Sequence, residues 1–473
     1  MKIRNPRTGE ADYEIAPLSR NAVVDETRRL RDGQVAWATK TPDERGAVLL
    51  QWADAIEADL GAIIPALTDD TGRGGISKIE AAGVPGQIRR WAEMAPQLIV
   101  EGQLTDQPTS VPTITTSTRL VPYQLVGVIS PWNFPMTLAL IDAIPALMAG
   151  SAVLVKPSEV TPRFIKPLME TVGEIPELAG VLSIIEGDGA TGAAMVDQVD
   201  YICFTGSVAT GRKVGEGAAQ AFIPASLELG GKDPMIVLAS ADPETAAATA
   251  LRASIVNTGQ ACQSIERVYV ARDIAEPFLA SLTTQAEAVE LNYPDINHGH
   301  IGPFIFEKQA EIAQNQIDDA VSKGAILLTG GTVENLGGGL YLRPTILTDV
   351  PPESDIIREE NFGPVIPVMI YDQIEEAIAQ ANDSIFGLSA AVVGGSVTEA
   401  EQIGTRLKAG AVSINDGSLT SMVWEAEKSS FGYSGLGASR MGTSGLMRFF
   451  RKQALIRQSG DAARIEAFAE ENF

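Results

Sequence analysis

Residues 151–211 read SAVLVKPSEVTPRFIKPLMETVGEIPELAGVLSIIEGDGATGAAMVDQVDYICFTGSVATG. Short apolar runs alternate here with longer segments of helical spacing, and a polar turn follows each run. The run VGVIS at Val126–Ser130 extends the alternation upstream. This pattern predicts a parallel, doubly wound sheet that binds its ligand at the carboxyl ends of the strands.

The segments before this sheet have a different character. Apolar residues at helical spacing predict helices over Arg20–Lys40, Pro42–Thr68 and Lys78–Val100. Thr109–Val128 is rich in threonine, valine and proline, which predicts a β-hairpin that continues into a further strand. The hairpin either serves contacts between subunits or forms ordinary edge strands.

Composition limits the classes of function. The chain has 473 residues and a net charge of −24, which disfavours partners such as nucleic acid and anionic membrane surfaces. Two cysteines provide neither a disulfide framework nor a metal-binding spacing, so we expect a reducing, cytoplasmic setting and no metal. The first residues lack the apolar core of a signal peptide. The apolar run Ala139–Val155 is interrupted by Asp142, Pro145 and Gly150, so no membrane span is expected.

A candidate nucleophile lies further on. Asp242 is a good helix cap, and the helix that it begins is predicted to end near Thr258, where Gly259 adopts a left-handed conformation. Cys262 follows on the next turn, either as a reactive thiol or as a small buried residue. Cys203, inside the strand YICFT, is expected to be buried.

A thiol nucleophile needs a group that moves protons. The two histidines, His298 and His300, lie in a polar loop, so a Cys-His pair is not favoured. Glu228, which two glycines follow, is the better candidate for a base.

Two features suggest a nucleotide site. A GxGxxG fingerprint is absent after the first strand, but the Gly206–Gly211 turn begins a helix and either faces a phosphate or makes a tight connection. Lys156 and Glu159 either hold the hydroxyls of a ribose or form a surface ion pair. A carboxylate at this position would repel a 2′-phosphate and favour NAD over NADP.

The motifs together resemble those of the aldehyde dehydrogenase superfamily, of the hydrolytic, non-CoA-acylating kind. The matching segments, in the order and approximate spacing of that family, are PWNFP (131–135), KPSE (156–159), FTGS (204–207), ELGGK (228–232), NTGQAC (257–262), EENFGPV (359–365), ANDSIFGLSAAV (381–392) and AGAVSIN (409–415). The resemblance implies an α/β fold with a doubly wound dinucleotide-binding domain (1–108 and 124–229), an α/β catalytic domain (230–447) and a bridging β-element (109–123 and 448–473). In that element the Thr109–Tyr123 hairpin would pair with Phe449–Arg457 and join copies into a homodimer or homotetramer.

The resemblance also implies roles for particular residues. Cys262 is similar to the family's nucleophile, Glu228 to its general base and Asn133 to the amide of its oxyanion hole. Lys156 and Glu159 resemble ligands of the adenosine ribose. The remaining implied contacts with NAD, or with NADP as a second possibility, are Ile129, Ser130, Trp132, Ser158, Gly189, Phe204, Gly206, Ser207, Gly211, Leu229, Glu360 and Phe362.

The implied reaction oxidises a small aldehyde to its carboxylic acid through a thiohemiacetal and a thioester on Cys262. By the same resemblance, the substrate wall is expected from Phe134, Leu138, Ile141, Ala261, Gln263 and part of the loop Ser418–Lys428 with Trp424. This mostly apolar set suits an aromatic or medium aliphatic aldehyde. The alternatives are a semialdehyde dehydrogenase, a CoA-acylating enzyme and a non-enzymatic relative. Asp142 stands where many family members carry lysine, and we expect it to compete for protons near the base.

Overall fold

The first of two large sheets is formed mainly by residues 125–228. The computed structural model describes residues 1–472, and its six-stranded sheet has the order β19-β9-β8-β5-β6-β7. Neighbouring strands are parallel except for β19, which pairs antiparallel with β9. The strands are β5 (Leu125–Ile129), β6 (Ala152–Lys156), β7 (Leu182–Ile184), β8 (Tyr201–Thr205), β9 (Ala225–Glu228) and β19 (Gly435–Leu436). The predicted doubly wound sheet is confirmed.

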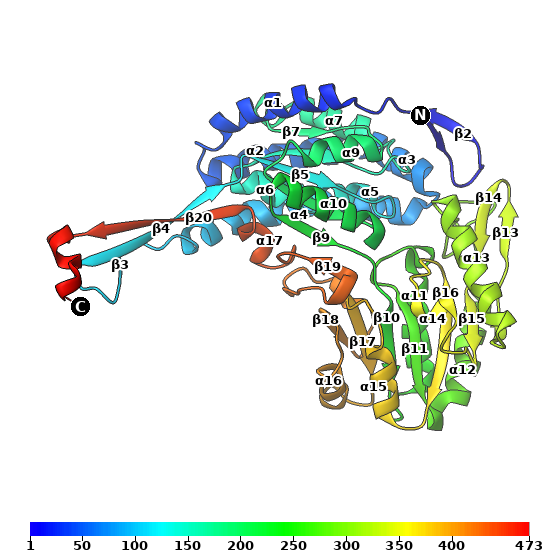
Figure 1. Cartoon of the computed structure of the whole chain (residues 1–473). Helices are drawn as coiled ribbons and strands as arrows, with labels where there is room; N and C mark the ends of the chain where they lie inside the picture. Colours follow the sequence, from blue (N-terminus) through cyan, green and yellow to red (C-terminus); the bar gives the residue numbers. More distant parts are fainter. Residues whose placement is uncertain (473) are drawn as a thin grey trace.

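Helices cover this sheet on both faces (Figure 1). They are α1 (Arg20–Trp37), α2 (Pro42–Ala58), α3 (Leu60–Thr71), α4 (Gly74–Glu101), α5 (Pro135–Leu140), α6 (Ala143–Ala149), α7 (Ile165–Gly173), α8 (Pro176–Ala179), α9 (Gly189–Val196) and α10 (Val208–Ala221). The single helix expected over Pro42–Thr68 is divided at Asp59, whose ψ of 14° departs from helical geometry. Among residues 1–472, no helix has both the length and the apolar character that crossing a membrane requires.

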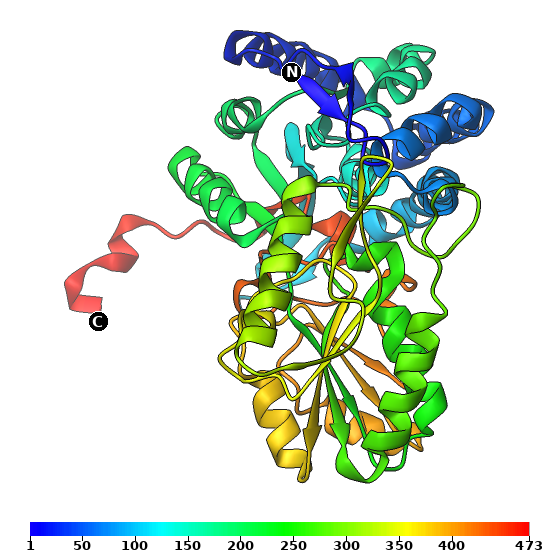
Figure 2. The same cartoon turned by 90° about the vertical axis from the view of Figure 1, so that its right-hand side faces the viewer.

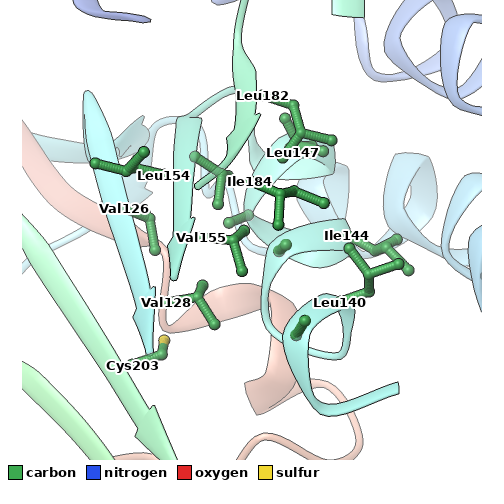
Figure 3. Packing of buried hydrophobic residues seen from close by; sticks show 14 of the residues in the cluster. Val126, Val128, Leu140, Ile144, Leu147, Leu154, Val155, Leu182, Ile184 and Cys203 are labelled. Atoms are coloured by element: carbon green, nitrogen blue, oxygen red, sulfur yellow. The ribbon is translucent and has the colours of Figure 1, made fainter. Parts of the chain in front are cut away.

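The core of this region lies between β5, β6, β7 and helices α5 and α6. Figure 3 shows Val128 and Val155 of the sheet on the side of Leu140 and Ile144, with Cys203 of β8 beside them. Cys203 is fully buried, as expected for a residue inside a central strand. Burial raises the pKa of this thiol to about 12, and full burial also keeps reagents from reaching it.

The second sheet has the order β12-β15-β16-β11-β10-β17-β18 and is parallel apart from β12. Its strands are β10 (Asp233–Val237), β11 (Ile265–Ala271), β12 (Ile326–Thr329), β15 (Thr345–Thr348), β16 (Val365–Tyr371), β17 (Ser389–Val393) and β18 (Ala411–Ile414). Met235 and Val237 face one core while Ile236 faces another, because successive side chains of a strand point to opposite faces.

Helices lie on both sides of this second sheet (Figure 2). They are α11 (Pro243–Ile255), α12 (Arg272–Glu287), α13 (Glu307–Ser322), α14 (Asp355–Arg358), α15 (Ile374–Asn382) and α16 (Val397–Gly404). Two short antiparallel pairs lie outside the two large sheets: β1 (Lys2–Arg4) pairs with β2 (Ala11–Glu14), and β13 (Val333–Leu336) pairs with β14 (Gly339–Leu342).

A β-arm extends away from the body, with the C-terminus at its tip (Figure 1). It contains β3 (Gln107–Pro108), β4 (Ile114–Pro122) and β20 (Phe450–Gln458), and a short helix, α17 (Ser444–Met447), precedes β20. Antiparallel pairing aligns Phe450 with Pro122 and Gln458 with Ile114, which confirms the expected pairing of the hairpin with the C-terminal segment. The predicted domain boundaries stay a prediction, and residue 473 of the last segment lies outside the described residues.

Candidate active site

A cavity of about 920 Å³ is lined by residues that follow strands of both sheets. Among the residues predicted as site residues, all but one line it: Ile129, Ser130, Trp132, Asn133, Lys156, Ser158, Glu159, Gly189, Phe204, Gly206, Ser207, Glu228, Leu229, Cys262, Glu360 and Phe362. The exception is Gly211, a residue of α10 that packs against the side chain of Leu229. A Cβ at position 211 would lie 2.5 Å from a methyl group of Leu229, so this glycine acts through packing.

The loop that carries Cys262 is fixed by an unusual backbone. Helix α11 ends at Ile255, three residues before the predicted end at Thr258, and that predicted end is wrong. Asn257 and Thr258 both adopt left-handed conformations, with φ of 60° and 59°. Their side chains hold this strained geometry, since the Thr258 hydroxyl donates to the carbonyl of Gly302 at 3.1 Å.

Gly259 brings this loop against a neighbouring segment. Its φ is 70°, as predicted, and a Cβ there would lie 2.2 Å from the carbonyl oxygen of Gly363. The close approach leaves Cys262 half-buried on the cavity wall.

Asn133 lies beside the cysteine loop, on the segment that follows β5. Its side chain is buried, and its amide nitrogen donates to the carbonyl of Gln260 at 3.0 Å. Its own backbone carbonyl accepts from Arg73 at 3.0 Å and from the side chain of Asn257 at 3.2 Å. These bonds fix the direction of the amide, which retains a second N–H for another acceptor.

Glu228 ends β9 on the same cavity and meets a cation that sequence reasoning missed. Its Oε2 lies 3.7 Å from the Nζ of Lys428 and accepts from the hydroxyl of Ser430 at 3.5 Å. Lys428 was expected only as the end of a substrate loop. Lys428 is distant in sequence, and no motif marks a lysine for this contact.

The electrostatic surroundings of the thiol are mainly acidic. Burial raises the pKa of Cys262 to about 12, Lys428 opposes this rise, and the carboxylates Glu360, Asp233 and Glu228 add to it. Burial likewise raises the pKa of Glu360 to about 8 and that of Asp233 to about 7. Forming a thiolate here therefore depends on nearby positive charge.

Lys156 and Glu159 occupy another part of the cavity. The Lys156 ammonium is buried and donates to Glu159 at 3.1 Å and to the carbonyl of Gly187 at 2.9 Å. Because Lys156 is buried, the alternative that it forms a surface ion pair with Glu159 is wrong. Ser207 caps α10 and Asp188 caps α9, so two helix N-termini lie on the same wall.

Glu266, another residue that sequence reasoning missed, holds the segment 360–362 in place. Its carboxylate accepts from the backbone N–H of Asn361 at 2.8 Å and of Phe362 at 3.0 Å, and it pairs with buried Lys232 at 2.7 Å. The ring of Phe362 then lies 5.4 Å from that of Trp132, edge to face.

Asp142 does not compete for protons as expected. It is fully buried, and its carboxylate pairs with Arg448 and, at 2.9 Å, with Arg440. Burial alone would raise its pKa, but the two guanidinium groups hold that pKa below its usual range. The carboxylate is therefore a fixed negative charge, and the expected competition is wrong.

The predicted substrate wall is only partly on the cavity. Leu138 lines it, whereas Gln263 is tied to the loop, accepting from Ser418 at 2.6 Å and from Thr420. Trp424 packs against Trp91, with ring centroids 4.6 Å apart.

The model of the aldehyde dehydrogenase family matches residues 1–455. The chain belongs to the aldehyde dehydrogenase family. It is therefore an NAD(P)-dependent oxidoreductase, and its sheets have the aldehyde dehydrogenase fold.

Related aldehyde dehydrogenases differ in the substrates that their names give. A protein of Mycolicibacterium smegmatis named "putative succinate-semialdehyde dehydrogenase (NADP(+))" is 35% identical over 430 residues, covering 90% of this chain and 83% of its own length. Betaine aldehyde dehydrogenase 1 of Rhizobium meliloti is 34% identical over 416 residues, covering 87% of this chain and 84% of its own length.

Solved aldehyde dehydrogenase structures superpose closely. The putative aldehyde dehydrogenase PutA from Anabaena variabilis is 49% identical with a TM-score of 0.96, covering 98% of both chains. A betaine aldehyde dehydrogenase from Staphylococcus aureus, in complex with NAD+, is 27% identical with a TM-score of 0.91, covering 98% of this chain and 95% of its own.

The cavity of this aldehyde dehydrogenase fits a dinucleotide cofactor. Its volume of about 920 Å³ is at the upper end of ordinary ligand pockets. Lys156 and Glu159 offer a donor and an acceptor for hydroxyl groups, and the first turns of α9 and α10 suit phosphate. Gly189 has open space where a side chain would point.

Proposed function

We propose that the chain oxidises a small uncharged aldehyde, aromatic or medium aliphatic, to its carboxylic acid with NAD. The observation that carries this proposal is that Cys262, Asn133 and Glu228 line one cavity together with Lys156 and Glu159. A thiol, an amide donor and a carboxylate are the groups that aldehyde oxidation through a thioester requires.

The first step is addition of the Cys262 sulfur to the carbonyl carbon. Negative charge then develops on the aldehyde oxygen, and the free N–H of Asn133 and the backbone N–H of Cys262 are the donors proposed to stabilise it. Loss of one such donor costs on the order of 3 kcal/mol in the transition state. NAD, when bound in the cavity, would supply the hydride acceptor for this adduct, and the oxidised acyl group would remain on Cys262 as a thioester.

The second step is hydrolysis of the thioester. Glu228 accepts a proton from water, the water oxygen bonds to the acyl carbon, and the carbon–sulfur bond breaks to release the acid. Without a carboxylate base the acyl group would pass more readily to a thiol such as CoA. Glu228 therefore supports a free acid over an acyl-CoA as the product.

Glu159 supports NAD as the preferred cofactor. Its carboxylate is bonded to Lys156 at 3.1 Å and would face a 2′-phosphate with like charge. The relative named for NADP(+) makes this preference worth measuring directly.

A semialdehyde is the second candidate substrate. Lys428 is a buried ammonium beside Glu228, and a substrate carboxylate of suitable reach would pair with it. The name of the Mycolicibacterium relative points in the same direction. A cationic substrate such as betaine aldehyde would be repelled by the same ammonium.

The test is a panel of aldehydes ranked by kcat/KM, with formation of NADH followed by absorbance and the product identified as acid or acyl-CoA. We expect Cys262→Ala to abolish turnover, and Glu228→Gln to retain an initial burst of NADH while slowing steady-state release of acid. Lack of NADH with every aldehyde, cofactor and added CoA would refute the proposal, as would a wild-type steady-state rate in either variant.

We also propose that the arm joins copies of the chain into a homodimer or homotetramer. Strand β20 forms the edge of its sheet, and Ile456 is 68% exposed on it. Sedimentation should give a mass above that of one chain, and Ile456→Asp should shift it toward the monomer.

A further inference from the structure

Lys428 is a buried cation beside Glu228. Its side chain is 5% exposed, and its Nζ has no hydrogen-bond partner within residues 1–472. An ammonium has three N–H groups, and burying one without acceptors is costly. The nearest opposite charge is the Glu228 carboxylate at 3.7 Å, a distance too long for a good direct hydrogen bond.

Glu228, which Lys428 contacts, lines the same cavity as Cys262. Burial raises the pKa of Cys262, and the carboxyl groups of Glu360, Asp233 and Glu228 add to that rise, whereas the charge of Lys428 lowers it.

We propose that Lys428 is a positioning residue that holds Glu228 beside Cys262 and supplies the positive charge that the attacking thiolate needs. The inference rests on the proposed function only in that Cys262 is the nucleophile and Glu228 the base. By holding Glu228, Lys428 keeps the carboxylate on the side of the cavity where the thioester forms. By supplying positive charge, it favours attack of the thiolate on the aldehyde.

The magnitude follows from the effect of one charge on another. An opposite charge within about 4–6 Å lowers the pKa of an acid by roughly 1–3 units. Lys428 lowers the pKa of Cys262, so removing the ammonium should raise that pKa, and each unit of rise corresponds to a roughly tenfold loss of thiolate. Because that pKa lies far above neutrality, a rise of about one unit would lower the thiolate fraction about tenfold at any pH near 7.

The experiment measures the thiol directly in the full-length protein, by the rate of alkylation with iodoacetamide at fixed pH and without aldehyde. Cys203 is fully buried and silent, and Cys262→Ala provides the blank. We expect Lys428→Met to react about tenfold more slowly, Lys428→Arg to lie closer to wild type, and Lys166→Met, on the exposed side of α7, to match wild type. Lys428→Gln is a second neutral variant if the methionine variant does not fold.

Turnover separates this role from substrate binding. In Lys428→Met, kcat/KM should fall by a similar factor for succinic semialdehyde and for an uncharged aldehyde of the same length. A wild-type alkylation rate in the neutral variants would overturn the proposal, and so would an equal loss in the arginine variant. A fall confined to the semialdehyde would overturn it too, because Lys428 would then be a substrate contact. Since alkylation needs no aldehyde, it remains decisive even if the proposed substrate is wrong.

Discussion

Replacement of Asp142 by asparagine should destabilise the protein strongly. The substitution keeps the shape of the side chain but removes its charge, leaving the Arg440 and Arg448 guanidinium groups facing each other in the interior. One nitrogen on each, Nε of Arg440 and Nη1 of Arg448, already lacks a partner within residues 1–472. Breaking a buried ion pair by removing one partner costs about 3–5 kcal/mol.

Urea unfolding followed by tryptophan fluorescence measures this loss. With a slope of about 3 kcal/mol per molar urea, the midpoint should fall by about 1 M or more. The matched control is Asp372→Asn, which removes an exposed pair with Arg272 and should leave the midpoint unchanged.

The pH dependence gives a second check. Because the pKa of Asp142 is lowered in the folded protein, its contribution to stability is complete above the unfolded pKa of about 4. The contribution is lost as the pH falls through the lower folded value, so wild type and variant should converge in acid. An unchanged midpoint at neutral pH would show that the two arginines are compensated in another way, and the reasoning would be refuted.

Three further predictions concern the cavity and its loops. Asn133→Ala should lower kcat by about 100-fold or more, measured by stopped-flow NADH formation, with little change in NAD affinity. Glu159→Ala should raise kcat/KM for NADP relative to NAD roughly five- to tenfold, because a like charge about 4 Å away costs on the order of 1 kcal/mol in water. Gly259→Ala should lower the unfolding temperature in a thermal melt, since its Cβ would collide with the Gly363 carbonyl, whereas Gly61→Ala, with open space around it, should not.

Local patterns made most of the first sheet and the cavity predictable. A strand buried on both faces reads as an apolar run, and a turn with glycine or serine follows it, so β6 and β8 could be placed from sequence. The cap at Asp242 was equally predictable, because aspartate is a favoured residue at helix N-termini. In the structure its side chain accepts from the backbone N–H of Thr245 at 2.9 Å, as a cap should.

Interactions between distant segments were not predictable in this way. The end of α11 depends on contacts of Asn257 and Thr258 with segments elsewhere in the chain, which override local helix propensity. The ionisation of Asp142 depends on Arg440 and Arg448, which lie 298 and 306 residues further along the chain. Glu228 likewise meets Ser430, which lies 202 residues further along the chain, and its neighbour Lys428, at contacts that only the folded structure reveals.

The free edge of β20 makes the stability of the folded protein depend on its concentration if a second copy pairs with that edge. Its backbone pairs with β4 on one side only, and nearly all its side chains face solvent. If a second copy covers that edge, mass action makes the melting temperature climb with concentration. A dilute preparation would then lose its arms first, while the two sheets and the cavity between them persist.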